Sequence, residues 1–404
     1  MRRKSANIIL CCVFLLLSGC AGRVELNELL IVSAIGVDVK DKQTNVHFQV
    51  VNAGGTAGGQ GGAPSGGSGG AVYTYTVKGE TVYEAVEKAS SLLPRKLMFS
   101  HVTCVIIGEK YARTQGLSPL FDFFERNHEI RDNMLMLVAK KSDAKSILSM
   151  YTPLFKNPAE SIKNRVKQSG TTTGVSKAIQ VKEAINWIYG EKRDVVIQGI
   201  ERISLDKKAE ETSILENIDA NNKTYHINGL AFFKKDKMKG WYTIEETRGW
   251  AIISGNVNDM FILTHKCGER KGNVGLMIKD IKSSVTPVWK NGIITYEIDV
   301  SGKALLQEVT CSIDVGNPAE LKKIENQIEK VLTKEILKTI RKAQKKKVDV
   351  FGFGKMLYDD YPVQWKGMKE NWGEQFSEAQ TDIKVKIILE TLGARVESIH
   401  GEVK

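Results

Sequence analysis

The chain has 404 residues, of which 42% are apolar and 26% charged, a composition ordinary for a globular protein. This length exceeds what one hydrophobic core usually organises, so we expect two or three domains. The formal net charge is +11, but the basic residues are spread out and no motif for reading DNA or RNA is present. Composition and charge therefore argue against a nucleic-acid partner.

The first twenty residues follow the pattern of a bacterial lipoprotein signal. Three basic residues in MRRK precede the apolar run Ile8–Leu17, which is shorter than the ~20 residues a membrane-spanning helix needs. A basic head, a short apolar body and a small-residue exit are typical of a secretory signal peptide. The exit, LSGC at 17–20, resembles a lipobox, where a diacylglycerol is joined to the cysteine and the chain is cut before it. We predict a signal peptide at residues 1–19 and lipidation of Cys20; a plain signal peptide is the alternative.

The lipid determines where the mature chain would reside. Two acyl chains anchor a protein stably, whereas one does so only marginally. From Arg23 to Lys404 no other apolar run reaches spanning length. We expect a water-soluble body tethered to the bilayer through Cys20, on the outer side of the membrane across which it is exported.

The cysteines left after the anchor are odd in number, which does not suggest a framework of disulfides. Cys104, Cys267 and Cys311 remain, and the mature chain has no CxxC pair. Cys104 and Cys311 lie in apolar, strand-like stretches. We predict buried free thiols.

Residues 20–203 are predicted to form an N-terminal α/β domain, because strand and helix patterns alternate there. Strand patterns occupy Leu29–Asp38, Asn45–Asn52, Ala71–Gly79, Val102–Gly108, Met134–Ala139 and Asp194–Ile203; helical patterns begin at Thr81, Ser118, Ser142 and Val181. Ten of the 18 residues at 53–70 are glycine, which predicts a flexible loop. A phosphate-binding loop is the alternative, but neither GxxxxGK[ST] nor a strand–GxGxxG–helix context follows. The polar segment 204–224 is predicted to be a linker.

The second half is predicted to form a middle β-rich domain at 225–310 and a C-terminal domain at 311–404. A strand pair turns at Lys235-Asp236, and Asn291-Gly292 is a strong hairpin signal. A long helix is expected over 318–347, because Asn317 is a good N-cap and Pro318 suits the first helical position. Its apolar stripe comprises Leu321, Ile324, Ile328, Val331, Leu332, Ile336 and Ile340. The alternating residues of TDIKVKIILETLG predict a final strand.

No pattern in the chain predicts a catalytic, cofactor-binding or metal-binding residue. None of the six histidines stands in an HExxH or similar spacing, and there is no GxSxG elbow. The two glycines of Asp349–Leu357 are interpreted as a tight turn. His101, at the start of a buried strand, is interpreted as structural, and the charges of Glu129–Asp132 as a local ion pair or a partner contact.

Several stretches together resemble the Ger(x)C family, the lipoprotein C subunits of nutrient germinant receptors in endospore-forming bacteria. The matching stretches are VELNELLIVSAIGVD, LPRKLMFSHVTCVIIGE, FDFFERNHEIRDN, INGLAFFKKDKMKGW with EETRGW, and DVFGFGKML followed by YPVQWK and a further Trp. They run in this order from the signal to near Gly393. The glycine-rich segment 53–70, and Ala21-Gly22 where the family often has Trp and charge, depart from the pattern.

The resemblance implies a multi-domain α+β fold, of three domains, with mixed and antiparallel sheets packed with helices after a cleaved lipoprotein signal peptide. It implies a non-enzymatic subunit that assembles with integral-membrane A and B subunits in the spore inner membrane and is required for germination. The resemblance implies no catalytic residue and no cofactor. Cys20 is the only functional residue that it implies, as the lipidation site. The alternative is a lipoprotein that captures a small nutrient directly, which would need a deep cleft with convergent polar groups.

Overall fold

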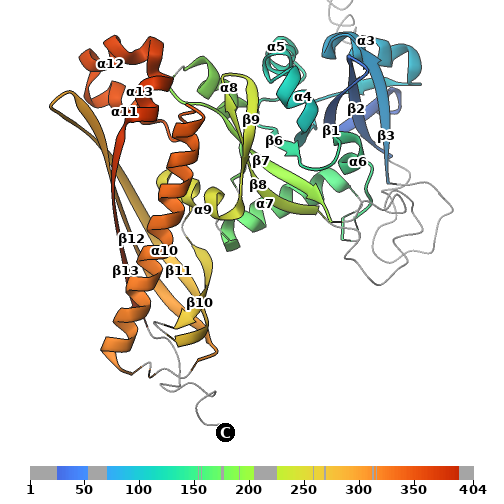
Figure 1. Cartoon of the computed structure of the whole chain (residues 1–404). Helices are drawn as coiled ribbons and strands as arrows, with labels where there is room; N and C mark the ends of the chain where they lie inside the picture. The colour runs from blue at the N-terminus through green and yellow to red at the C-terminus, as the bar shows by residue number, and fades with distance from the viewer. Residues whose placement is uncertain are drawn as a thin grey trace, which may run out of the picture.

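The computed structural model describes residues 25–52, 71–152, 154–155, 157–173, 177–190, 192–203, 225–257, 259–267, 270–311, 314 and 316–390. The predicted signal peptide, Cys20, the glycine-rich segment 53–70 and the predicted linker 204–224 lie outside these residues. In the described part, helices pack against two sheets of mixed strand direction (Figure 1). This confirms the predicted multi-domain α+β class.

The first sheet has a parallel centre and antiparallel flanks. Its strands are β1 (Leu29–Lys40), β2 (Gln43–Val51), β3 (Val72–Gly79), β4 (Lys96–Met98), β5 (Cys104–Gly108), β6 (Leu135–Ala139), β7 (Val196–Arg202), β8 (Tyr225–Lys234) and β9 (Lys237–Tyr242). They lie in the order β3-β2-β1-β5-β6-β7-β8-β9, and β4 pairs with the beginning of β1. The pairs β1–β5, β5–β6 and β6–β7 are parallel, whereas β2 with β3 and β8 with β9 form antiparallel hairpins.

Helices cover both faces of this sheet, which explains its continuous apolar central strands. One face packs against α3 (Val82–Leu92), α4 (Glu109–Thr114), α5 (Ser118–Arg126) and α8 (Val181–Tyr189), and the other against α6 (Ala144–Leu148) and α7 (Pro158–Thr173). Strand β5 shows the alternation: Val105 and Ile107 join the first core cluster, whereas Cys104 and Ile106 join the second.

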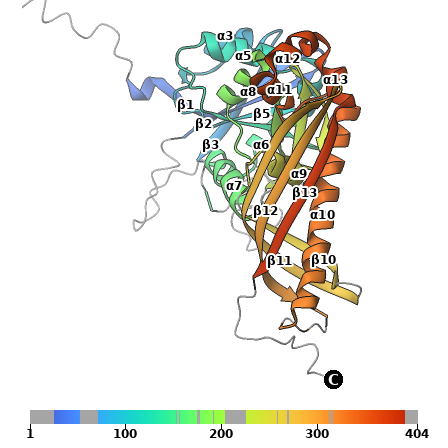
Figure 2. The same ribbon diagram turned by 90° about the vertical axis from the view of Figure 1, so that its left-hand side faces the viewer.

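The second sheet is covered on one face by a single long helix. Its strands are β10 (Met260–Cys267), β11 (Arg270–Lys290), β12 (Ile293–Val309) and β13 (Gln380–Glu390), in that order. Because β12 and β13 are parallel, the chain between them must cross over. That crossover holds α10 (Pro318–Lys345), α11 (Phe353–Asp360), α12 (Pro362–Met368) and α13 (Trp372–Glu378). Helix α10 runs along the sheet (Figure 2), and its residues Ile324, Ile328, Leu332, Ile336 and Ile340 are buried.

The turns and the long helix form where local signals predicted them. Asn291 and Gly292 have φ of 51° and 78°, as a two-residue hairpin turn of the primed type requires. Lys235, between β8 and β9, has φ of 53°. Asn317 accepts a hydrogen bond from the amide of Ala319 at 2.9 Å, and the helix begins at Pro318 and ends at Lys345, two residues before the predicted end.

The sheets divide the chain differently from the predicted domain boundaries. Strands β8 and β9 were assigned to a middle β-rich domain, but β8 pairs with β7 and completes the first sheet. The rest of that predicted domain and the predicted C-terminal domain share the second sheet, because β13 pairs with β12 from Thr295 to Leu305. The resemblance implied three domains, whereas the described residues form two sheets. The polar composition of 204–224 does not predict a boundary between sheets, because strand pairing decides which sheet a strand joins.

The prediction for the cysteines is right at one position and wrong at another. Cys104 is a free, fully buried thiol on β5, and burial raises its pKa to about 12, so it stays protonated and unreactive. Cys311 is disulfide-bonded, which corrects the expectation of a free thiol. The apolar stretch around Cys311 predicted its burial but carries no information about what lies opposite it in space. The side chain of Cys267 lies outside the described part.

Helix α9 (Ile244–Ile253) leads out of the first sheet and packs closely on α10. The guanidinium of Arg248 donates to both carboxylate oxygens of Glu335, with Nε 2.8 Å from Oε2. Thr339 donates to the carbonyl oxygen of Glu246 at 3.0 Å. A β-carbon at Gly249 would meet Thr339 Oγ1 and lie 2.9 Å from the carbonyl oxygen of Glu335. A glycine at this position therefore allows the two helices to approach.

Alanine at two helical glycines should change stability in opposite directions. We expect Gly249→Ala to lower the free energy of unfolding by about 1–3 kcal/mol, because the methyl group overpacks the α9–α10 contact. Gly367 lies in α12 and is exposed, and a β-carbon there would have no other atom within 4 Å. Gly367→Ala should raise stability by up to about 1 kcal/mol. Chemical denaturation of the two variants measures both; equal effects would contradict the close contact.

Candidate functional site

The residues singled out in the sequence are placed as follows. Cys20 lies outside the described residues. His101 is exposed and precedes β5, whose first residue is Cys104, so it does not begin the buried strand as predicted. Glu129 forms a local ion pair with Lys96 at 3.3 Å. In the described part of the chain, no three His, Cys, Asp or Glu side chains gather as a metal site would require. No helix there is long and apolar enough to cross a bilayer.

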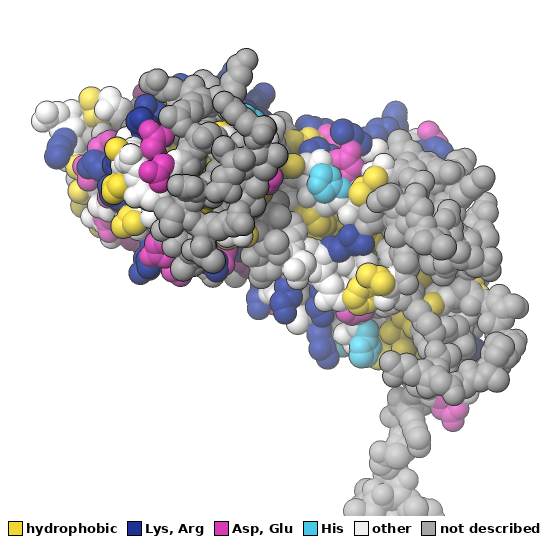
Figure 3. Space-filling view, turned by 90° about the horizontal axis from the view of Figure 1, so that it is seen from below, with side chains coloured by type: hydrophobic (Ala, Val, Ile, Leu, Met, Phe, Trp, Pro, Cys, Tyr) yellow, Lys and Arg dark blue, Asp and Glu magenta, His cyan; other side chains and the backbone are white. Residues whose placement is uncertain are grey.

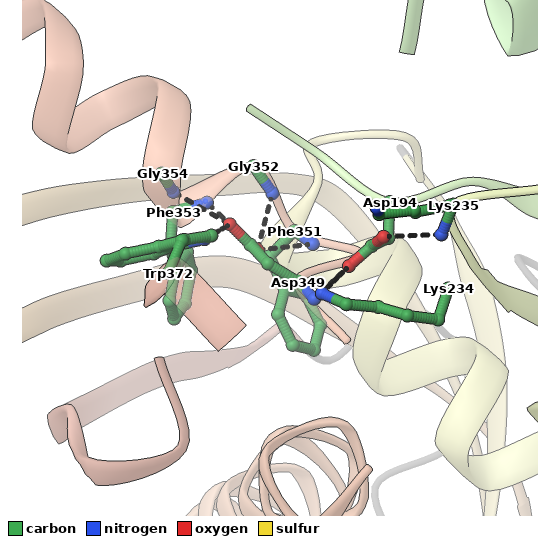
Figure 4. Close-up of polar contacts among 9 residues, drawn as sticks. All are labelled: Asp194, Lys234, Lys235, Asp349, Phe351, Gly352, Phe353, Gly354 and Trp372. Atoms are coloured by element: carbon green, nitrogen blue, oxygen red, sulfur yellow. Dashed lines mark hydrogen bonds and ion pairs between the residues drawn. The ribbon is translucent and has the colours of Figure 1, made fainter. Parts of the chain in front are cut away.

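The motif DVFGFG folds around the carboxylate of its aspartate. Asp349 Oδ1 accepts hydrogen bonds from the amides of residues 351–353 at 3.0–3.2 Å. Asp349 Oδ2 accepts from the amide of Gly354 at 2.7 Å and from Nε1 of Trp372 at 3.0 Å (Figure 4). Burial is the largest influence and raises the pKa of this carboxyl, the amide and indole donors lower it in part, and the nearby Asp194 carboxylate raises it again. Five N–H donors hold its two oxygens, an arrangement that suits an acceptor carboxylate.

A second carboxylate ties this turn to the first sheet. Asp194 Oδ2 accepts from the backbone amide of Asp349 at 2.8 Å and from Nζ of Lys234 at 3.1 Å. Its Oδ1 accepts from the amide of Lys235 at 3.1 Å, and its own amide donates to the carbonyl of Asp349 at 2.7 Å. Figure 4 shows Asp194 between the β8–β9 turn and the Asp349 turn. Two segments 155 residues apart are thus held by reciprocal hydrogen bonds.

Aromatic side chains complete this junction. The guanidinium of Arg193 lies 4.4 Å from the ring centroid of Trp187, and its Nε donates to the carbonyl of Val350 at 3.0 Å. The indole of Trp250, from EETRGW, donates to the same carbonyl at 3.0 Å. Burial lowers the pKa of Arg193 to about 10, so the side chain stays charged at neutral pH. We call the contacts of Asp194, Asp349, Arg193, Trp250 and Trp372 the junction.

A cavity of about 620 Å³ opens beside the junction. Its lining includes Arg193, Lys234 and Lys369, together with Asp194 and Glu370. A cavity of this size is large enough for a small solute. The Asp194 carboxylate, however, already accepts three hydrogen bonds from the chain, and Arg193 already donates to Val350. These groups serve the joint between the sheets and leave few polar atoms to converge on a ligand.

A second hollow, of about 800 Å³, lies between α3 and α5. We call it the α3–α5 groove. Its floor is apolar and its rim carries both basic and acidic groups. The floor residues are Val86, Leu93, Leu97, Phe99 and Phe123, and the charged or titratable rim residues are Glu87, Arg95, Lys96, Arg126, His128 and Glu129. Most of these residues come from the stretches LPRKLMF and FDFFERNHEIRDN.

The comparisons with known proteins agree with the order of these motifs. Residues 22–202 match the family described as "Spore germination protein N-terminal domain", and residues 228–393 match "Spore germination B3/ GerAC like, C-terminal". Spore germination protein KC of Bacillus subtilis (strain 168) is 30% identical over 410 residues, covering 100% of this chain and 99% of the relative. Spore germination protein YndF of the same organism is 25% identical and covers 97% of both chains.

The crystal structure of the GerBC protein has the same fold, with a TM-score of 0.57 at 19% identity, covering 88% of this chain and 96% of that one. The two family matches and the 30% identity to a full-length relative show that this chain belongs to the Ger(x)C family of spore germination proteins. Membership supports a role in spore germination.

Sequence reasoning interpreted DVFGFG as a tight turn and missed that its aspartate builds the joint between the sheets. A signal was present: an aspartate followed closely by glycines is typical of a turn in which a carboxylate accepts backbone amides. Its partner, Asp194, carried no comparable signal because it lies far away along the chain.

Removing one acceptor from the junction should weaken the whole fold. Asp349→Asn keeps the size of the side chain but turns an NH2 group toward N–H donors. We expect the free energy of unfolding to fall by about 2–4 kcal/mol. Asp382, an exposed carboxylate on β13, gives the control: Asp382→Asn should change stability by less than about 0.5 kcal/mol. Urea denaturation compares the two, and equal stability of both variants would contradict a central role for Asp349.

Proposed function

We propose that this protein is the lipid-anchored, non-enzymatic C subunit of a membrane nutrient germinant receptor. The observation that carries the proposal is membership of the Ger(x)C family along the whole chain. The lipobox ending in Cys20 supplies an anchor. The proposed location is the outer face of the spore inner membrane, and the proposed partners are the integral-membrane A and B subunits.

The anchor would act by raising local concentration. A tethered protein meets its membrane partners as an effectively intramolecular reaction, so a weak contact becomes sufficient. Leu29, the first residue of β1, follows Cys20 by nine positions. At no more than ~3.6 Å per residue, Leu29 lies within about 32 Å of the lipidated residue. The tether would therefore keep the start of β1 within this distance of the bilayer that holds the membrane subunits.

The fold supports a subunit that acts by contacting its partners through its outer surface. In the matched motifs Asp349–Gly354 and Glu245–Trp250, the amide of Asp349 donates to Asp194, the indole of Trp250 to the carbonyl of Val350, and the guanidinium of Arg248 to Glu335. These contacts join segments that lie far apart in the chain. A nutrient-capturing lipoprotein is the second candidate, and the cavity beside the junction is where its ligand would bind. Asp194, Lys234 and Arg193 in its lining are already hydrogen-bonded within the chain, so we favour the receptor subunit.

Purification from spores separates the two candidates. A tagged protein solubilised in detergent from spore inner membrane should bring polytopic A and B subunits with it, identified by mass spectrometry. In a matched Cys20→Ala strain, the tagged protein should leave the membrane fraction and recover at least about tenfold less of these subunits. A wild-type protein recovered without them but with a bound small solute would contradict the proposal and favour solute capture.

A further inference from the structure

Strand β13 forms one edge of the second sheet, because it is the last strand in the order and pairs with β12 on one side. Figure 1 and Figure 2 both show α10 lying beside it. An unpaired strand edge presents backbone N–H and C=O groups to which another extended chain can pair, so native proteins usually cover it. The contacts between α10 and β13 show how much of this edge is covered.

Two glutamates of α10 cover the far end of the edge. Glu329 accepts a hydrogen bond from the amide of Ile387 at 3.1 Å, and Glu325 accepts one from the amide of Leu389 at 2.9 Å. Because these two amides bond to α10, they do not bond to β12. Backbone groups alternate along a strand, so the odd-numbered residues of β13 direct their N–H and C=O groups toward the open edge.

The middle of the edge is left uncovered. Gln344 donates to the carbonyl of Ala379 at 2.7 Å, just before β13 begins. Between this contact and the two glutamates, Thr381, Ile383 and Val385 face the same edge. Their outward backbone groups have no partner among the residues that the structure describes. At ~3.3 Å per residue, the uncovered length of about 13 Å has room for about four or five residues of an added strand.

A hollow of about 670 Å³ lies between this part of β13 and α10. Leu337, Ile383 and Val385 line it with half-buried apolar side chains. Lys330 and Lys334, one turn apart on α10, line it with exposed basic side chains. We call this hollow the β13 groove. It combines free backbone groups, an apolar floor and two lysines.

The charge available in the β13 groove is basic. Neither Lys330 nor Lys334 has an ion-pair partner in the described part of the chain. Glu329 is already bonded to the backbone of β13, and the ammonium of Lys384 lies 3.7 Å from the carboxylate of Asp382. Seen from below, by contrast, basic and acidic side chains lie interspersed wherever the surface is not grey (Figure 3). The two lysines therefore favour an acidic occupant.

A second copy of this chain would fit the groove poorly. At exposed positions β13 carries Lys384 and Lys386 against a single acid, Asp382. Two copies joined through this edge would bring the lysines of both strands, and those of both α10 helices, close together. Like charges on neighbouring strands are destabilising.

We propose that the uncovered edge of β13 binds an extended acidic segment of a partner protein by strand addition. The backbone of the partner pairs with the outward amides and carbonyls of Ile383 and Val385, and its Asp or Glu side chains pair with Lys330 and Lys334. In such complexes main-chain pairing gives affinity and side chains give specificity. The inference deepens the proposed function, on which it rests because a receptor subunit needs a contact with its partners, but it does not depend on Cys20.

A synthetic peptide tests the groove in the full-length protein kept in detergent. The probe is a fluorescein-labelled peptide of alternating Glu and Val with blocked ends, and the control peptide has Lys in place of Glu. Fluorescence anisotropy measures binding, and hydrogen exchange with mass spectrometry measures protection of the β13 amides. We expect the Glu peptide to bind and to slow exchange in the segment 381–386 at least about tenfold. The Lys peptide should do neither.

Two sets of variants separate charge from backbone pairing. Lys330→Glu with Lys334→Glu should weaken binding of the Glu peptide at least about tenfold. The control pair Lys279→Glu with Lys282→Glu, exposed on β11, makes the same change in net charge and should weaken it less than about twofold. Val385→Pro removes an outward amide, which an edge strand tolerates, and should weaken binding at least about fivefold. Val385→Thr keeps the amide and is its control.

Several outcomes would overturn the proposal. Equal binding of the Glu and Lys peptides, or no binding of the Glu peptide up to about 1 mM, would refute an acidic partner. Binding without slower exchange in the segment 381–386 would place the peptide elsewhere. Dimers in sedimentation that Val385→Pro dissociates would make this edge an interface between two copies. If Val385→Pro does not fold, the lysine variants and the exchange data still decide.

Failure of this inference is distinct from failure of the proposed function. The peptide experiment needs neither the A and B subunits nor a bilayer. Recovery of those subunits from spores, unchanged by Val385→Pro and by the exchange of Lys330 and Lys334 for Glu, would leave the subunit assignment intact and refute the β13 groove as their contact.

Discussion

The two sheets depend on one buried carboxylate for their relative placement. Asp349 gathers the backbone of the turn that follows it and the indole of Trp372, and its own amide is held by Asp194 from the first sheet. A buried charge is costly unless it is fully hydrogen-bonded, so this carboxylate is stable in one arrangement of the turn, α13 and the first sheet. The same core cluster of apolar residues continues from the first sheet across α9 and α10 to the second, and the junction fixes the register of that contact.

This constraint explains the charged and aromatic residues of the matched motifs. In Glu245–Trp250 the acid caps its helix, the arginine pairs with α10, the glycine permits close approach and the tryptophan reaches the Asp349 turn. Residues of this kind make a rigid body whose outer surfaces remain available. In a rigid body, a contact made at one end determines the position of the other.

Local patterns along the chain predicted most strands and the helices α3, α5, α6, α8 and α10, because hydrophobic period, caps and turn residues act over a few positions, but they did not predict α4, α7, α9 or α11–α13. Asn291-Gly292, Asn317 and the alternation in β13 are examples. They could not predict that β8 pairs with β7 or that β13 returns beside β12, since a local pattern does not determine which strands pair. The disulfide of Cys311, the bond between Asp194 and Asp349 and the α3–α5 groove were missed for the same reason. The predicted lipidation of Cys20 stays a prediction, because it rests on the signal sequence alone.

The contacts of the junction should make the two sheets one rigid body. Double electron–electron resonance between nitroxides at Tyr73→Cys on β3 and Ile388→Cys on β13, both exposed positions, measures it directly. We predict one narrow distance distribution in the otherwise unchanged protein and a broad one when Asp194→Ala removes the acceptor for the Asp349 amide. A broad or multiply peaked distribution in the protein with an intact junction would contradict the account.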